Sequence, residues 1–534
     1  MRLVAILLLG CASALLTDAR AAEDSGLSQG ERARKKAVDK RRRVIFNCDA
    51  GRLWMTGTGT PKGFLAPRIK PLVGTQVDTI FLDVIAGDAP VYASKVQPVY
   101  GIAQGRDALP NLKSLIEAGH CPLRIVTDFA HQNDMEVFAS IRMNDVHDSF
   151  IEGHIATWKK EHPEMLVDKT GSLPTMQLYV TALDFARQAV RDRKFEIIEE
   201  VCERYEVDGI ELDYIRHPVL FSRTMRGLPV TEHELLIMTS FTRRVRQHLD
   251  EVAVRHGRPL LLAVRVPDTC ELARNVGLDV KTWLKEDLLD ILVAGGGYGL
   301  FTLPVAEWTA VAHRYDVPVY PCINQGPARN ISQGALLEGV RAMAANWYRA
   351  GADGVYTFNL FAPFDDLYGE TLAATRREVY ACLNEIGDPT TLVRKNKLFS
   401  VDGMVYHHYT FITSKTPLPL SLTAEKVHRV SLLVGDDVEA AAREKILAQL
   451  QLKLSLRGPV EKDKLLVKLN NQPLTDRKFI TVNAKELEHQ ISFPLDVFPL
   501  KNGENVLEAS MQGPGQRSGQ SVQLVGVHLR VTYK

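Results

Sequence analysis

Between residues 44 and 359 the sequence alternates short apolar runs with stretches that have the spacing of amphipathic helices. Strands separated by helices pair in parallel, and eight of them over about 320 residues match one closed (β/α)8 barrel with enlarged loops. A doubly wound open sheet is the second choice, because the first loop lacks its glycine-rich fingerprint. The expected strands are 44–48, 79–85, 135–143, 207–214, 260–266, 289–294, 317–323 and 354–359, and the expected helices are 109–118, 183–204, 232–256, 280–286, 305–314 and 333–350.

The pattern changes after residue 384, where short strands and turns replace the helices. We therefore expect a barrel domain at 44–384, a linker at 385–400 and an all-β sandwich at 401–534. Asn470-Asn471 has the composition of a hairpin turn. The stretch 500–507, Leu-Lys-Asn-Gly-Glu-Asn-Val-Leu, resembles a strand of galactose-binding-like β-sandwiches. That resemblance implies a carbohydrate-binding module or a purely structural accessory domain, although the helix-like insert 438–450 departs from a plain sandwich.

The first 21 residues have a short apolar run that reads as a signal peptide, and Cys11 offers a lipid anchor as the alternative. We expect an exported protein, periplasmic, on the cell surface or secreted, with a basic linker at 22–43. No later stretch is long enough to span a bilayer. A formal net charge of +1 argues against a nucleic-acid partner. The six other cysteines are widely spaced, which favours neither a zinc site nor a disulfide scaffold.

The fourth expected strand carries the most distinctive sequence, Val-Asp-Gly-Ile-Glu-Leu-Asp-Tyr-Ile-Arg-His-Pro at 207–218. Because side chains alternate along a strand, Glu211 and Asp213 share one face and Ile210 and Leu212 the other. This segment resembles the corresponding strand of the "family-10-like" group of bacterial glycoside-hydrolase-like barrels, and the resemblance extends over residues 43–384. It implies a barrel that acts on carbohydrate at the carboxyl ends of its strands.

Polar residues also accumulate at the ends of the other expected strands. In a barrel these ends converge on one face, so we expect the side chains to form one polar site. Asn, Asp and Arg offer paired hydrogen bonds to sugars, and aromatic rings offer flat contact surfaces. The residues expected to bind substrate are Asp83, Arg142, Asn144, Tyr214, Arg216, His217, Arg265, Tyr298, Asn324 and Asn359.

Glycoside hydrolysis needs one ionised and one protonated carboxyl group. Asp213 is the expected ionised partner, because arginines follow the neighbouring strands. The proton donor is left open among Asp268, Glu211 and Asp145, and a structural ion-pair layer is the alternative for Glu211 and Asp83. The seventh strand carries no acid, which disfavours a two-glutamate mechanism. An aspartate at the end of the fourth strand resembles the arrangement of α-glycosidase-type barrels more closely, and it leaves room for a barrel that binds glycans without cleaving them.

Other chemistries have weaker signals. Glu211, Asp213 and His217 could bind a divalent metal, as a sugar lyase or isomerase would require, but the spacing is not that of a known metal motif, and we expect neither a metal nor a cofactor. Gly295-Gly296-Gly297, after the sixth strand, could cradle a phosphate, but a tight loop that leaves room for ligands fits it better. The oligomeric state is not indicated.

Overall fold

The structure, a computed structural model, describes residues 28–534 apart from 50–58, 150, 152, 171–172, 325–334, 361–376, 378–379, 404–408, 424–425 and 513–520. The expected signal peptide and the possible lipid anchor at Cys11 lie outside these residues. Within them, no helix has the length and apolar character that crossing a bilayer requires.

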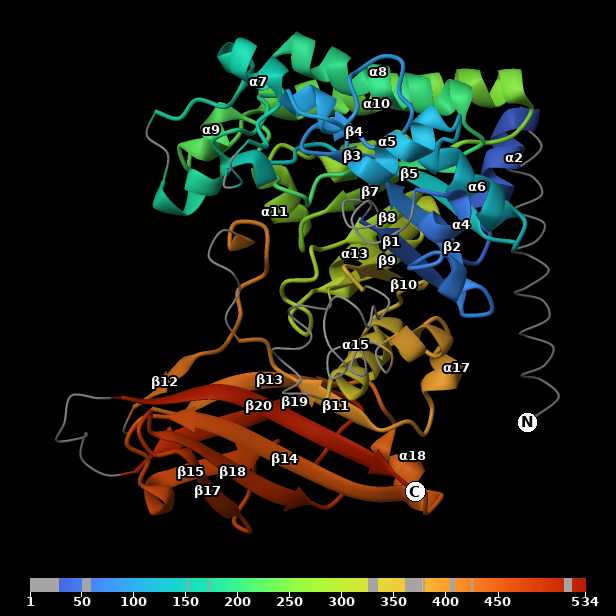
Figure 1. The fold of residues 1–534 in the computed structure, drawn as a ribbon. Coiled ribbons are helices and arrows are strands. Elements are labelled where there is room, and N and C mark those ends of the chain that lie inside the picture. Colours follow the sequence, from blue (N-terminus) through green and yellow to red (C-terminus); the bar gives the residue numbers. More distant parts are fainter. Residues whose placement is uncertain are drawn as a thin grey trace.

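Eight parallel strands close into a barrel, which confirms the expected fold class (Figure 1). Around the barrel the order is β1, β2, β5, β6, β7, β8, β9, β10 and back to β1, so neighbours in sequence pair throughout. The strands lie within a residue or two of the expected ranges. They are β1 (Val44–Cys48), β2 (Val77–Asp83), β5 (Glu136–Arg142), β6 (Gly209–Asp213), β7 (Leu261–Val266), β8 (Ile291–Ala294), β9 (Val319–Asn324) and β10 (Val355–Phe358).

Helices cover the outside of the barrel, and α8 and α10 are the longest of those described. A small hairpin of β3 (Ile85–Ala86) and β4 (Ala89–Pro90) follows β2, and short helices extend the loops after β5 and β6. The described α-helices of this region are α4 (Pro61–Leu65), α5 (Pro110–Glu117), α6 (Pro122–His131), α7 (Thr157–Glu161), α8 (Gln188–Arg204), α9 (Ser222–Met225), α10 (Glu232–His256), α11 (Cys270–Asn275), α12 (Val280–Lys285), α13 (Val305–Ala312) and α15 (Leu336–Arg349).

The stretch expected as a basic linker, 22–43, is a helix over much of its described part. In α2 (Gln29–Val38), Ser28 and Glu31 form a capping box at the first turn. The basic residues are used in ion pairs: Arg34 binds Asp290 (2.7 Å), and the buried Arg42 binds Glu136 (2.8 Å). These partners hold the segment against the amino-terminal end of the barrel, so its basic composition does not make it an open linker.

The C-terminal region forms two antiparallel sheets, an arrangement consistent with the expected sandwich. One contains β11, β20, β14, β18 and β17, with β12 paired to β20, and the other contains β13, β19, β15 and β16. The strands are β11 (Lys397–Ser400), β12 (Leu420–Leu422), β13 (His428–Val434), β14 (Leu447–Arg457), β15 (Leu465–Leu469), β16 (Gln472–Pro473), β17 (Lys478–Asn483), β18 (Glu488–Leu495), β19 (Gly503–Met511) and β20 (Val522–Tyr533).

One local prediction in this region is confirmed and another is refined. Asn470 and Asn471 both have positive φ and join β15 to β16, as a two-residue hairpin requires. Asn505 folds the turn before β19, since its side chain donates to the carbonyls of Lys501 and Gly503. The helix-like insert is the short α18 (Val438–Arg443), after which β14 begins.

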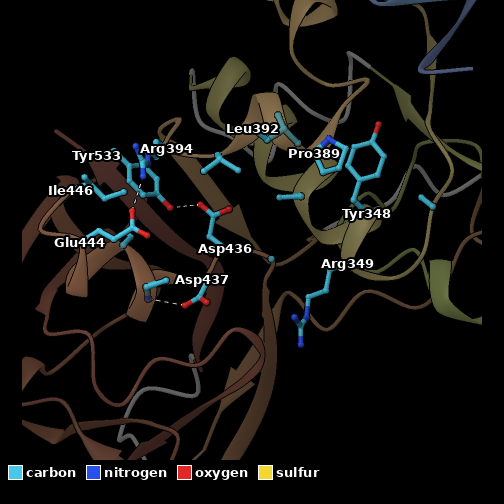
Figure 2. A pocket seen from close by; sticks show the side chains of 16 residues that line it. Tyr348, Arg349, Pro389, Leu392, Arg394, Asp436, Asp437, Glu444, Ile446 and Tyr533 are labelled. Atoms are coloured by element: carbon cyan, nitrogen blue, oxygen red, sulfur yellow. Dashed lines mark hydrogen bonds and ion pairs between the residues drawn. The ribbon is translucent and has the colours of Figure 1, made fainter. Parts of the chain in front are cut away.

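The expected linker at 385–400 contains α17 (Pro389–Leu392) and β11, which pairs with β20. The two regions therefore meet along α15 and α17 rather than through an open tether. Figure 2 shows a groove of about 610 Å³ at this junction. Its acidic groups are paired within the protein: Asp436 with Lys397 and Tyr533, and Glu444 with Arg394. The groove is therefore a seam of mixed polar and apolar residues between the two regions.

Candidate active site

The interior of the barrel has an apolar lower part and a polar upper part. Ile45, Phe81, Phe138 and Leu261 belong to one buried cluster inside the barrel. Nearer the carboxyl ends the inward residues include Glu211, Asp213 and Arg265, beside the apolar Phe358. The two-residue period of the strands turns these polar side chains inward, and they lie at the end where barrels carry their chemistry.

Asp213 and Arg265 form the central pair of the polar part. They are opposite each other in the register of β6 and β7, and Arg265 Nη1 lies 3.5 Å from Asp213 Oδ2. The backbone N–H of Ile215 also donates to Asp213 Oδ1 (3.0 Å). Both side chains are buried, and Arg265 lies 4.2 Å above the ring centre of Phe358. The guanidinium supplies the opposite charge that an ionised carboxylate needs at a buried position.

Glu211 lies one level deeper on the same face of β6, in register with Ser140 and Ala263. Its side chain is fully buried, and Tyr356 donates its hydroxyl to Oε2 (3.3 Å). Burial, reinforced by the charge of Asp213, raises the pKa of Glu211 to about 8. Glu211 is therefore mainly protonated at neutral pH, next to the carboxylate that Arg265 holds.

Arg142, at the end of β5, is surrounded by three acids. Its guanidinium lies 3.0 Å from Asp49, 2.8 Å from Asp83 and 2.9 Å from Asp145. The backbone N–H of Ile85 donates to Asp83. Burial raises the pKa of Asp83 well above its usual value, although Arg142 acts in the opposite direction. This arrangement is the structural ion-pair layer that the sequence left open as the alternative role of Asp83. Arg142, which was also expected to bind substrate, is part of the same layer.

Asp145 is joined to a pair of histidines. Its carboxylate binds the Nδ1 of His147, whose Nε2 lies 3.0 Å from Arg216 Nη2. Burial opposes the charge on Asp145, but His147 and Arg142 hold the pKa of its carboxyl well below the usual value. A permanently ionised Asp145 that Arg142 already binds is unsuited to donating a proton.

His217 faces His147 edge-on, with ring centres 4.8 Å apart. The backbone N–H of Val146 donates to its Nδ1 (3.1 Å). Burial, followed by the charge of Arg216, lowers the pKa of His217 well below its usual value, so the ring is neutral. His217, in the loop after β6, and Asn359, directly after β10, both have positive φ, a backbone strain that clusters at functional sites.

The described residues contain one group with metal-ligand geometry, and it differs from the set considered from the sequence. The ligand atoms of Asp145, His147 and His217 lie within 4.8 Å of one another. Each of these residues is already bonded to a protein group, so the cluster fits a hydrogen-bond relay better than a metal site. Glu211 and Asp213 are absent from it.

Asp268 follows β7 and is also buried. Its Oδ2 accepts a hydrogen bond from the backbone N–H of Ser414 (2.8 Å). Burial raises the pKa of Asp268 to about 7, and the nearby Asp402 acts in the same direction. At neutral pH this carboxyl therefore exchanges its proton readily, as a general acid must.

Two predicted substrate residues point elsewhere. Asn144 donates to the carbonyls of Leu183 and Val219 and accepts from the N–H of Leu183, so its amide joins two loops. Tyr214 is one residue beyond the inward-facing Asp213 and therefore faces the outer helices, where its ring lies 5.9 Å from that of Trp283. Neither geometry fits a substrate ligand, and both predictions are withdrawn.

The other predicted residues stay at the carboxyl end. Asn324 ends β9 and is buried, Asn359 follows β10 and is partly exposed, and Arg216 is partly exposed beside Phe358. Tyr298 is buried because Tyr409 stacks on it. Sequence reasoning missed Tyr409, Asp402 and Ser414, because all three follow the point at which the barrel was expected to end.

Part of the barrel matches a known protein family. Residues 63–225 match the family described as Glycosyl hydrolase-like 10. The expected resemblance to glycoside-hydrolase-like barrels is thereby confirmed for that segment, which includes β2, β5 and β6. The match supports a carbohydrate-acting, hydrolase-like function. No curated protein sequence matches the chain significantly.

Solved structures that resemble the chain include two carbohydrate-active proteins. One is the alpha-L-fucosidase isoenzyme 2 from Paenibacillus thiaminolyticus, with a TM-score of 0.42 and 15% identity over 67% of this chain and 51% of that one. The other is the PgaB (BpsB) glycoside hydrolase domain from Bordetella bronchiseptica, with a TM-score of 0.40 and 13% identity over 64% of this chain and 98% of that one. The chain thus spans about half the length of the fucosidase.

Proposed function

We propose that this barrel hydrolyses glycosidic bonds in a poly- or oligosaccharide, with Asp213 as the ionised carboxylate. The observation that carries the proposal is the Asp213–Arg265 pair at the polar end of the barrel, 3.5 Å apart and buried. A carboxylate fixed on the barrel axis can act as nucleophile or base towards a sugar carbon. The family match of residues 63–225 supports the same class of reaction.

Asp268 is the proton donor in this proposal. Of the three acids left open by the sequence, Asp145 is bound by Arg142 and held ionised, and Glu211 lies a level below Asp213 inside the barrel, in register with Ser140 and Ala263. Asp268 lies beyond the end of β7, and its pKa of about 7 keeps it protonated in a useful fraction of molecules. Glu211 then serves the site by remaining neutral beside Asp213, which avoids a second negative charge.

The test is reducing-sugar release by the full chain from a broad panel of polysaccharides, with Asp268→Asn as the main variant. Asp316→Asn is the matched control, because Asp316 is exposed, lies outside the site and has a positive φ that Asn tolerates. We expect the kcat of Asp268→Asn to fall by at least about a hundredfold. The loss should be smallest for glycosides whose leaving groups need no protonation. Equal losses for all leaving groups would contradict the role of Asp268.

Glycan binding without turnover is the second candidate function. It is favoured by the burial of the carboxylates, since Asp213 is 2% exposed and Asp268 1% exposed. The same panel distinguishes the two functions. A binding protein is retarded by the glycan in affinity electrophoresis, and it releases no reducing ends.

A further inference from the structure

A segment of the C-terminal region, residues 409–414, lies against the carboxyl end of the barrel. In Figure 1 the orange chain before β12 lies between the C-terminal sheets and α11. Asp402 lies two residues after β11, and its Oδ2 accepts hydrogen bonds from the backbone N–H groups of Phe301 (2.7 Å) and Thr302 (2.5 Å). A buried carboxylate thus joins the loop after β8 to the chain that follows β11.

The segment holds Asp268 at two points. The backbone N–H of Asp268 donates to the carbonyl of Ile412 (3.1 Å), and the backbone N–H of Ser414 donates to Asp268 Oδ2 (2.8 Å). The first bond fixes the backbone and the second fixes the carboxyl group. Both of these partners come from outside the barrel, and the N–H of Gly296, in the loop after β8, also acts on the carboxyl. The barrel strands alone therefore do not determine where the Asp268 carboxyl points.

Aromatic contacts fix the segment itself. The ring of Tyr409 stacks on that of Tyr298, with centres 3.9 Å apart and planes 14° from parallel. Phe411 meets Tyr179 edge-on at 5.8 Å. Such pairs contribute beyond their buried area, and they connect the segment to the loops after β8 and β5.

The triglycine stretch makes this close approach possible. A Cβ on Gly295 would lie 2.9 Å from Asp268 Oδ1, and one on Gly296 would lie 2.5 Å from the Tyr298 ring. Side chains at these positions would therefore displace the carboxyl and the stacked pair. Protein groups, rather than a phosphate, occupy the space that these glycines provide.

We propose that segment 409–414 is a positioning element of the active site, in which the backbone N–H of Ser414 orients the proton donor Asp268. The inference rests on the proposed function of the barrel and gives the C-terminal region a direct part in it. That region is then neither a detachable carbohydrate-binding module nor a passive accessory, because the barrel without it would carry a misdirected Asp268.

The proposal predicts a direction for the pH profile. A hydrogen bond to the ionised carboxyl lowers its pKa, and Ser414 acts in that direction, as does the N–H of Gly296, while burial and Asp402 act oppositely. Replacing Ser414 with proline removes the N–H. Asp268 then stays protonated to higher pH, so the basic limb of kcat/KM moves upward.

The first experiment measures kcat/KM against pH for the full-length wild type, Ser414→Pro and Ser414→Thr, with circular dichroism as the check on folding. Ser414→Thr keeps both the N–H and the hydroxyl. We expect the basic limb to move up by about one pH unit or more in Ser414→Pro, as the loss of a hydrogen bond to a charged group implies, and to stay in place in Ser414→Thr. An unmoved limb in a folded Ser414→Pro would overturn the proposal.

Hydrogen exchange tests the same contact without activity. In full-length Asp268→Ala the amide of Ser414 loses its acceptor, so we expect its exchange to accelerate at least about tenfold, while the amide of Phe301, bound to Asp402, keeps its protection. Unchanged exchange at Ser414 would overturn the placement of the segment. If no glycan is hydrolysed, the proposed function fails, and this measurement still decides whether the segment holds Asp268. If Ser414→Pro does not fold, the hydrogen-exchange measurement likewise decides whether the segment holds Asp268.

Discussion

Removing the positive charge of Arg265 should destabilise the barrel, because Asp213 would remain buried without its partner. At 3.5 Å and an effective dielectric constant of about 20, the Coulomb attraction between the two is about 5 kcal/mol. Desolvation of both groups offsets much of that attraction in the wild type. The cost of removing one partner is nevertheless about 3–5 kcal/mol, since an uncompensated charge is left inside. Arg265→Met should therefore lower the free energy of unfolding by about 4 kcal/mol.

Thermal unfolding gives the assay for this prediction. A barrel of roughly 340 residues has an unfolding entropy of about 0.7 kcal/mol/K, so a loss of 4 kcal/mol lowers its Tm by about 6 °C. The double variant Arg265→Met/Asp213→Asn should recover most of this loss, because it contains no unpaired charge. If the double variant is as unstable as Arg265→Met, the loss comes from the other contacts of Arg265, with Phe358 and with the carbonyls of Gly295 and Gly296, and the ion-pair argument is refuted.

Three further predictions concern single groups. The folded pKa of Glu211, about 8, lies above its unfolded value. The contribution of Glu211 to the free energy of unfolding is therefore complete at low pH and is lost as pH rises towards 8. The Tm of Glu211→Gln relative to wild type should therefore increase between pH 5 and pH 8, and a constant difference would contradict the assignment. Gly209→Ala should cost about 2–3 kcal/mol of unfolding free energy in urea, because its Cβ would lie within 3.0 Å of the Phe138 ring, whereas Gly30→Ala in α2 should be harmless. EDTA should leave both Tm and activity unchanged, because Asp145 and its two histidines are bonded to protein groups, and a Tm lowered by EDTA and restored by zinc would show a metal site.

The barrel could be predicted because its strands are encoded locally. Each expected strand is an apolar run between turn residues, and the alternation at 209–213 correctly placed Glu211 and Asp213 inside with Ile210 and Leu212 outside. The hairpin at Asn470-Asn471 was equally local. Such features depend on a two-residue period and on turn chemistry, and both are visible in the sequence.

The site could be predicted only in part, because partner choice is not local. Asn144 and Asp145 are adjacent in the sequence, yet Asn144 bonds to loop carbonyls and Asp145 to Arg142. Tyr214 was assigned to the site although the strand period sends it outward. Ser414, which follows Asp268 by 146 residues, has no sequence signal that points to the barrel. Contacts of this kind are set by how the two regions pack.

The central claim is that Asp213 is the essential carboxylate, and the most direct test compares reducing-sugar release by Asp213→Asn and Asp316→Asn. The amide is nearly isosteric with the carboxyl, so circular dichroism should show both variants folded. We predict that Asp213→Asn loses at least a thousandfold in kcat, about 4 kcal/mol of transition-state stabilisation, while Asp316→Asn keeps the wild-type rate. Hydrolysis by Asp213→Asn at the wild-type rate would contradict the account.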